Sequence, residues 1–341
     1  MKTWKKIVLL VGIMLLAFGL TVLQIAHHRG ESFIVMPTWN GSNDVGELSY
    51  DQKGYTVCRG GEETFSTKDV SRLNIEWLSG RVKIERYAGS GIVVREKSAV
   101  SLSEDQSMRY RLSGGTLWIL PCANNVIELP EKELTVFVPK DAVFTDVDVT
   151  ATSAGTELKQ IAVKDSITLV SVSGSIRAEE ISCTDLNFGS TSGSQKVFSV
   201  EVERDVILAS VSGSIEVSGV SCSKLALNST SGSQSVADAS CEQLELQSVS
   251  GSQKAEDVDC REVRAGSSSG SVKLSFAGEP KSVEVGTISG SVTLTFPDGT
   301  PLDLDFDTVS GGLNGSALEG RHPVRVIVGT TSGSLTIRYS A

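Results

Sequence analysis

Three aspartates spaced two residues apart are the first residues of this chain whose types and spacing could do chemistry. Asp303, Asp305 and Asp307 alternate with apolar residues in the segment LDLDFD. On a β-strand, side chains two residues apart lie on the same face, and carboxylate oxygens are ligands that calcium prefers. The segment is therefore a candidate calcium site. The same alternation is typical of an ordinary strand with one solvated face, and we favour that interpretation.

Histidine-dependent catalysis has few residues to draw on. The chain has 3 His residues, of which His27 and His28 adjoin an apolar segment and His322 precedes a proline in an expected loop. A Ser-His-Asp site needs a suitably placed His. The sequence also contains no phosphate-binding glycine loop, CxxC or HExxH motif. We therefore predict no catalytic residues, no cofactor and no enzymatic activity.

The composition restricts the classes of partner. The 341 residues include 31 Lys and Arg against 41 Asp and Glu, which gives a formal net charge of −10. Binding to nucleic acid depends on cationic contacts to phosphates, so no nucleic-acid partner is expected. Only 6% of the residues are aromatic, whereas 33 are Gly. This bias toward small residues argues against large pockets lined by rings.

A Ser-Gly pair recurs through the second half of the chain, in motifs such as VSGSIRA and TSGSQKV. An imperfect earlier copy lies at Gly155, and from there the successive glycines are 19 to 22 residues apart. Such a period is the signature of a repeat architecture. The repeat glycines are Gly174, Gly193, Gly213, Gly232, Gly251, Gly270, Gly290, Gly311 and Gly333.

Each repeat unit has the pattern of short strands rather than of a helix. Apolar residues alternate with small or polar ones, and the units are rich in Ser, Thr and Val, which favour extended backbone. Units too small to bury a face alone must stack. We therefore predict an all-β fold, a single-stranded parallel β-solenoid with about 19 to 20 residues per coil. An antiparallel β-sandwich is the less favoured alternative, because its strands would not all need the same corner.

Within this solenoid, each repeat glycine is expected at a corner that needs either a positive φ or close backbone contact. Four cysteines each lie ten residues before a repeat glycine, which predicts a stacked row. No His is near them in sequence, and ligands in a line do not form the tetrahedron that zinc prefers. We favour a row of small buried thiols, with a disulfide between neighbouring coils as the alternative. The row consists of Cys183, Cys222, Cys241 and Cys260.

The N-terminal region has the pattern of a membrane anchor. Residues 7–26 contain no charged side chain, and twenty helical residues span roughly 30 Å, the thickness of a bilayer core. Three lysines precede this transmembrane helix within residues 1–6, so the N-terminus is expected in the cytoplasm and the remainder outside the cell. A cleaved signal peptide is the alternative. It is less favoured because the apolar run is long and no clear A-x-A site follows.

The rest of the chain divides into two parts by pattern. Residues 27–69 are polar and irregular, and we expect an extracytoplasmic spacer there. Residues 70–341 are expected to form the β-solenoid, with degenerate opening coils and a cap over residues 70–150 and regular Ser-Gly coils over residues 151–341. A cap is needed because an exposed solenoid end would be an aggregating edge.

The segment ELTVFVPKDAVFTDVDVTATSAG, followed by repeated SVSGSI and TSGSQ units, resembles the bacterial putative-adhesin β-solenoid domain of LiaG-type membrane-anchored envelope proteins. The resemblance covers about residues 70 to 341. It implies an extracytoplasmic β-solenoid, sometimes linked to envelope-stress operons, without an established enzymatic activity. It supplies no catalytic residues, and the cysteine row is not part of the family's pattern.

Three functions remain open at this point. The favoured one is a non-catalytic binding, adhesion or scaffold module at the cell envelope, whose partner is a cell-wall polymer or an envelope protein. Repetition suits such a module because it offers many equivalent contacts. The alternatives are an accessory component of envelope-stress signalling and, less favoured, a carbohydrate-active enzyme on a β-helix scaffold that uses clustered carboxylates.

Overall fold

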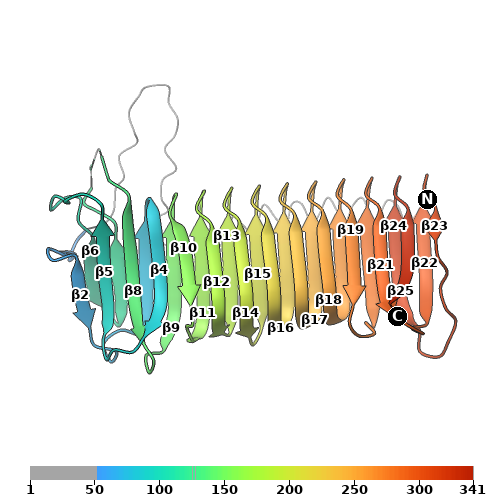
Figure 1. The fold of residues 1–341 in the computed structure, drawn as a ribbon, viewed down its shortest axis with the longest axis horizontal. Coiled ribbons are helices and arrows are strands. Elements are labelled where there is room, and N and C mark those ends of the chain that lie inside the picture. The colour runs from blue at the N-terminus through green and yellow to red at the C-terminus, as the bar shows by residue number, and fades with distance from the viewer. Residues whose placement is uncertain (1–51, 125, 127, 341) are drawn as a thin grey trace, which may run out of the picture.

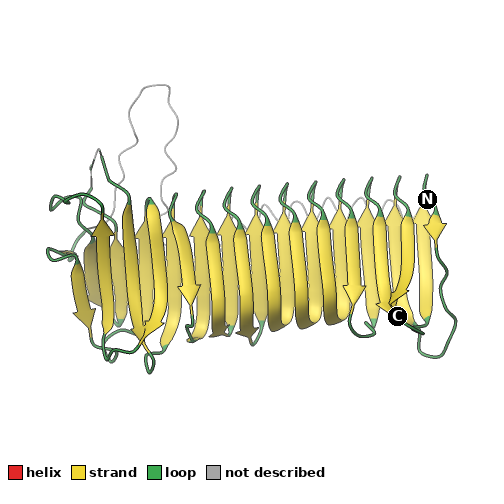
Figure 2. Ribbon diagram, in the orientation of Figure 1, coloured by secondary structure: helices red, strands yellow, loops and turns green. Residues whose placement is uncertain are grey.

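The computed structural model describes residues 52–124, 126 and 128–340. These residues form a long rod built from β-strands and connecting turns (Figure 1), and the described part contains no helix (Figure 2). Accordingly, the described residues include no helix that is long and apolar enough to cross a membrane. The transmembrane helix expected at residues 7–26 lies outside the described residues, as do its flanking residues 1–6.

The strands form two ladders that run along the rod. The first ladder contains, in spatial order, β1 (Thr56–Val57), β6 (Arg109–Ser113), β7 (Thr116–Leu120), β3 (Arg72–Trp77), β9 (Phe144–Ala151), β11 (Val163–Ser171), β13 (Asp185–Ser190), β15 (Asp205–Ser210), the second parts of β16 (Ile215–Ser229), β17 (Gln234–Ser248) and β18 (Gln253–Ser267), then β20 (Ser282–Thr287), β24 (Val324–Thr330) and β22 (Leu302–Thr308).

The second ladder contains β2 (Glu62–Phe65), β5 (Ile92–Ser98), β8 (Lys132–Pro139), β4 (Gly80–Tyr87), β10 (Gly155–Lys159), β12 (Ile176–Cys183), β14 (Gln195–Val202), the first parts of β16 (Ile215–Ser229), β17 (Gln234–Ser248) and β18 (Gln253–Ser267), then β19 (Val272–Phe276), β21 (Val292–Pro297), β25 (Leu335–Ser340) and β23 (Leu313–Asn314). Because β16, β17 and β18 run through both ladders, the two join into one sheet.

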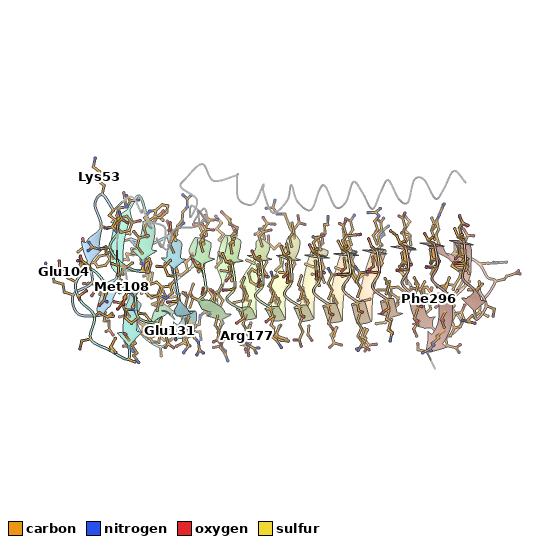
Figure 3. All side chains as sticks on the ribbon, turned by 90° about the horizontal axis from the view of Figure 1, so that it is seen from above. Lys53, Glu104, Met108, Glu131, Arg177 and Phe296 are labelled. Carbon is orange, nitrogen blue, oxygen red and sulfur yellow. The ribbon has the colours of Figure 1, made fainter. Side chains whose placement is uncertain are left out.

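In the middle of the rod, each coil pairs in parallel with the coils before and after it in sequence. The predicted all-β, parallel β-solenoid is therefore confirmed. Alternate side chains of each strand point inward, as in the pattern of β12, where Ile176 and Ala178 are buried. The inward residues form one hydrophobic core that extends from Cys58 to Ile337. Figure 3 shows side chains along the whole rod, with the fully buried Met108 near one end and Phe296 toward the other.

The repeat glycines are required by close backbone contact and not by a positive φ. None of the nine, all of which the structure describes, has a positive φ. A Cβ on Gly232 would lie 1.9 Å from the carbonyl oxygen of Gly213 in the preceding coil. The positive-φ residues of the middle coils lie at a different corner, a bend within or directly after the strands of the second ladder. They are Gln160, Glu180, Ser199, Gly219, Asp238 and Asp257.

At the C-terminal end, the order of the coils in space differs from their order in sequence. The last coil, β24–β25, lies between β20–β21 and β22–β23. The glycines show the same order, because a Cβ on Gly333 would approach Gly290 and one on Gly311 would approach Gly333. The regular coils predicted over residues 151–341 therefore stack out of sequence order at this end.

The N-terminal end is interleaved in the same way. The coil formed by β3 and β4 lies between β7–β8 on one side and β9–β10 on the other. Antiparallel strands then cover the outer coil, because β5 pairs with β8 and β6 pairs with β7. Strands β1 and β2 complete this cap. Ordered strands thus begin inside the stretch that was expected to be a spacer up to residue 69.

Candidate functional site

The C-terminal half of the rod carries an open groove of about 840 Å³ on the corner where the two ladders meet. Three successive coils supply Cys222, Cys241 and Cys260, which we call the thiol column. The interleaved C-terminal coil supplies His322, Pro323 and Val324. Charged side chains of both signs line the rest of this thiol groove. They are Glu242, Asp259, Arg261, Glu279 and Lys281.

Strand register positions the thiol column. Cys222 pairs with Cys241 across β16 and β17, and Cys241 pairs with Cys260 across β17 and β18. The Sγ atoms of Cys241 and Cys260 lie 2.7 Å apart. Because the thiol of Cys241 shares hydrogen bonds with the thiols of Cys222 and Cys260, and because partial burial disfavours the thiolate, its pKa is raised well above the ordinary value. Cys241 therefore stays protonated.

The cysteines of the thiol column are not equally buried, in contrast to the predicted row of small buried thiols. Cys260 is 5% exposed, whereas Cys222 and Cys241 are only half-buried and face the groove. The fourth predicted member, Cys183, is buried and pairs with Val202 of the following coil instead of with a cysteine. Its pKa is raised to about 12, mainly by burial and further by Asp185 and Glu203. Cys183 therefore stands apart from the thiol column.

The candidate calcium residues lie at the end of the rod. Asp303, Asp305 and Asp307 are all exposed on β22, the outermost strand of the first ladder. Residues two apart on a strand are separated by roughly 6.6 Å, whereas calcium binds oxygens at about 2.3–2.6 Å. Two oxygens bound to one calcium ion lie at most about 5 Å apart, so neighbouring carboxylates would have to turn toward each other to share an ion. Across the described residues, no group of three or more His, Cys, Asp or Glu side chains could hold a metal.

The turns around the repeat glycines place an exposed serine at the same point of every regular coil. We call this row the serine edge. Its members are Ser173, Ser192, Ser212, Ser231, Ser250, Ser269, Ser289, Ser310 and Ser332. Several of these hydroxyls donate to a carbonyl of a neighbouring coil, such as Ser250 to Thr230 at 3.3 Å and Ser269 to Val249 at 3.4 Å. Because a hydroxyl oxygen has two lone pairs, each exposed serine can still accept a hydrogen bond while it donates one.

A second row of hydroxyls supports these turns from inside. The buried Ser229 donates to the carbonyl of Gly232 at 2.7 Å, and the buried Ser248 accepts from the backbone N–H of Gly251 at 2.8 Å. The two hydroxyls also lie 3.2 Å apart across the coils. These contacts satisfy backbone groups that the tight turns would otherwise leave unpaired. The serine edge is therefore held in a regular array.

The N-terminal cap contains a buried charge cluster. Lys132 Nζ lies 2.6 Å from Glu96 Oε1, and the two side chains are 1% and 2% exposed. Lys132 also donates to the carbonyls of Gln106 and Pro121 and lies over the ring of Trp77 at 5.0 Å. Burial lowers the pKa of Lys132, and the nearby Glu96 carboxylate opposes that change. These contacts place the cluster in the structural core of the cap, away from the thiol groove.

The sequence indicated the thiol column but not the groove around it. The equal spacing of Cys222, Cys241 and Cys260 placed them on successive coils, whereas His322 reaches the groove only because the last coil is interleaved. The repeat lengthens to 21 and 22 residues between Gly290 and Gly333. That lengthening was the one available indication of an irregular C-terminal end.

The fold and these rows define a parallel β-solenoid whose equivalent turns form a polar edge. Residues 198–338 match the Toastrack DUF4097 family model. Over those residues, this match agrees with the resemblance to the putative-adhesin β-solenoid family. No curated protein matches the chain.

Three solved structures are similar to the chain. A putative cell adhesion protein from Clostridium sporogenes is 13% identical, with a TM-score of 0.23, over 82% of this chain and 98% of that one. A putative adhesin from Bacteroides fragilis is 10% identical, with a TM-score of 0.33, over 84% and 97%. A putative adhesin from Parabacteroides distasonis is 10% identical, with a TM-score of 0.37, over 83% and 96%.

Proposed function

We propose that this protein is a non-catalytic binding or adhesion module of the bacterial cell envelope, anchored in the membrane by residues 7–26 and exposed outside the cell. The partner is a cell-wall polymer or an envelope protein. The serine edge carries the proposal, because it repeats one exposed hydroxyl along the regular coils. Weak contacts to a repeating polymer add up when many of them form together.

The outer face of the second ladder is less suited to bind one extended polymer. Its charges are largely paired with each other, as in Lys196 with Glu216 at 2.7 Å and Lys254 with Glu256 at 2.7 Å. The hydroxyl oxygens of the serine edge, in contrast, retain acceptor capacity. A neutral polymer rich in hydroxyl and amide groups therefore fits the serine edge better than it fits the charged face.

The test is a pull-down of the detergent-solubilised full chain with intact cell-wall sacculi and with solubilised envelope proteins, each with and without calcium. We expect retention on sacculi that does not depend on calcium. The triple variant Ser231→Ala, Ser250→Ala, Ser269→Ala should bind about tenfold more weakly, since three hydroxyl contacts worth roughly 0.5 kcal/mol each are lost.

A matched control removes three half-buried hydroxyls from the second ladder, in the triple variant Ser218→Ala, Ser235→Ala, Ser275→Ala. It should bind sacculi as the unmodified chain does. An equal loss in both triple variants would contradict a specific role of the serine edge. Recovery of one membrane protein without binding to sacculi would favour the signalling accessory. Polysaccharide cleavage that Asp305→Ala abolishes would favour an enzyme.

A further inference from the structure

The thiol column has the geometry for disulfide formation between successive coils. Directly paired residues on neighbouring strands are roughly 4.8 Å apart, and the Cα atoms of disulfide-bonded cysteines are usually about 4.4–6.8 Å apart. Cys241 is paired in this way with a cysteine on both sides, Cys222 and Cys260. All three are free thiols in the structure.

The sulfur atoms are already in contact. Cys241 Sγ lies 2.7 Å from Cys260 Sγ, and the same thiol shares a hydrogen bond with that of Cys222. Cys222 and Cys260 are two coils apart and have Cys241 between them. Because Cys222 and Cys241 are only half-buried and line the open groove, a small oxidant from solvent can reach the column.

We propose that Cys222, Cys241 and Cys260 form a redox site in which one disulfide moves along the column through Cys241. A low-molecular-weight disulfide such as oxidised glutathione is the oxidant. The thiols of Cys241 and Cys260 give up two electrons and two protons, a bond forms between their sulfurs, and the oxidant is reduced to two thiols. Cys222 remains a thiol.

Thiol–disulfide exchange then needs no further oxidant. The thiolate of Cys222 attacks Cys241 Sγ, the Cys222–Cys241 bond forms, the Cys241–Cys260 bond breaks, and Cys260 leaves as a thiolate that takes up a proton. The reverse step restores the first linkage. Cys241 takes part in both linkages as the attacked sulfur, in keeping with its hydrogen bonds to both neighbours.

The experiment maps disulfides in the detergent-solubilised full chain after treatment with oxidised glutathione, acid quenching and alkylation of the remaining thiols. Trypsin cleaves after Lys224, Lys254 and Arg261, so the three cysteines fall in separate peptides, 205–224, 225–254 and 255–261. We expect peptide 225–254 to be linked to 255–261 in some molecules and to 205–224 in others. If all 6 cysteines are still thiols after oxidation, and are therefore alkylated, the proposal is overturned.

Single variants separate the central cysteine from its neighbours. Cys241→Ser should abolish both linkages, Cys222→Ser should keep only the bond to Cys260, and Cys260→Ser should keep only the bond to Cys222. A linkage between peptides 205–224 and 255–261 in Cys241→Ser would contradict the proposal. Cys183→Ser is the matched control and should leave both linkages unchanged, because Val202 occupies the paired position in the next coil. Circular dichroism verifies that each variant is folded.

Movement of the disulfide has its own readout. If exchange occurs, the ratio of the two linkages reaches the same value after rapid oxidation with diamide and after slow oxidation with glutathione. A ratio that keeps depending on the oxidant, after its removal and further incubation, would show two independent disulfides instead of one that moves.

Discussion

The middle coils and the N-terminal cap bury their residues by different means. In the middle, each coil repeats the one before it, and small residues bring the backbones together, as at Gly213 and Gly232. In the cap, antiparallel strands cover the outer coil, and an ion pair between Lys132 and Glu96 is enclosed in the core. The middle is thus stabilised by many equivalent contacts, whereas the cap depends on a few that occur once.

This difference shows what repetition does and does not specify. A repeated motif fixes the shape of one coil and its fit onto another, but equivalent coils could stack in several orders. The order at the two ends must come from residues outside the repeat, because both ends are interleaved while the middle is not. Variants that act on one region and spare the other test this division.

The largest effect is expected in the cap, for Lys132→Met. The change leaves Glu96 buried without its cation, and breaking a buried ion pair in this way costs about 3–5 kcal/mol. Urea unfolding monitored by tryptophan fluorescence measures the loss, because Trp77 and Trp118 both lie in strands of this region.

The control is Lys196→Met in a middle coil. Lys196 and its partner Glu216 are each 46% exposed, and such surface pairs contribute about 0–1 kcal/mol. The double variant Lys132→Met, Glu96→Leu should recover much of the loss, since it removes both charges. Equal costs for the two single lysine variants would show that the cap does not depend on its ion pair.

A smaller effect is expected in the middle, for Gly232→Ala. The added Cβ would lie 1.9 Å from the carbonyl oxygen of Gly213, so the two coils must move apart, at a cost of about 1–3 kcal/mol. Thermal unfolding followed by circular dichroism measures the change. Gly312→Ala is the matched control, because nothing lies within 4 Å of its added Cβ. If both variants have the same melting temperature, close contact is not what requires glycine at the repeat positions.

The smallest effect on stability is expected for the triple variant Asp303→Asn, Asp305→Asn, Asp307→Asn. These exposed side chains have no packing contact to lose, so the free energy of unfolding should change by less than about 0.5 kcal/mol. Calcium should not alter the melting temperature of the unmodified chain or of the variant. A rise of several degrees with calcium in the unmodified chain alone would support the candidate calcium site.

The same variant should change association. Charged side chains on an outermost strand oppose pairing with another chain, so light scattering should detect more end-to-end association once the three charges are removed. A control with the same change in charge on inner strands is Glu245→Gln, Glu262→Gln, Glu284→Gln, which should remain as monodisperse as the unmodified chain. Greater association of this control would show that the chains associate through a surface other than the exposed end of the rod.

The middle coils could be predicted from the sequence because a strict period encodes them directly. The same spacing that placed the glycines also placed Cys241 between Cys222 and Cys260. The sequence predicted that glycine is required at these corners by either a positive φ or close backbone contact. Close backbone contact is what the structure shows.

The ends could not be predicted, since their contacts join residues with no periodic relationship. Lys132 meets Glu96 across 36 positions of sequence, with neither residue in a repeated motif. His322 lines the thiol groove only because of the strand order at the C-terminal end. Periodicity carries no information about such pairings, which depend on the packing of whole coils.

The interleaved ends also determine the order in which the chain can complete its fold during synthesis. The coil of β3 and β4 emerges first and accepts neighbours on both sides, so it can serve as a template in two directions. At the other end, β22 pairs only with β24 and β23 only with β25 within the described part. Residues 302–314 therefore have no strand to join until residues 324–340 have left the ribosome. The coil of β24 and β25 then completes the rod by inserting between β20–β21 and β22–β23.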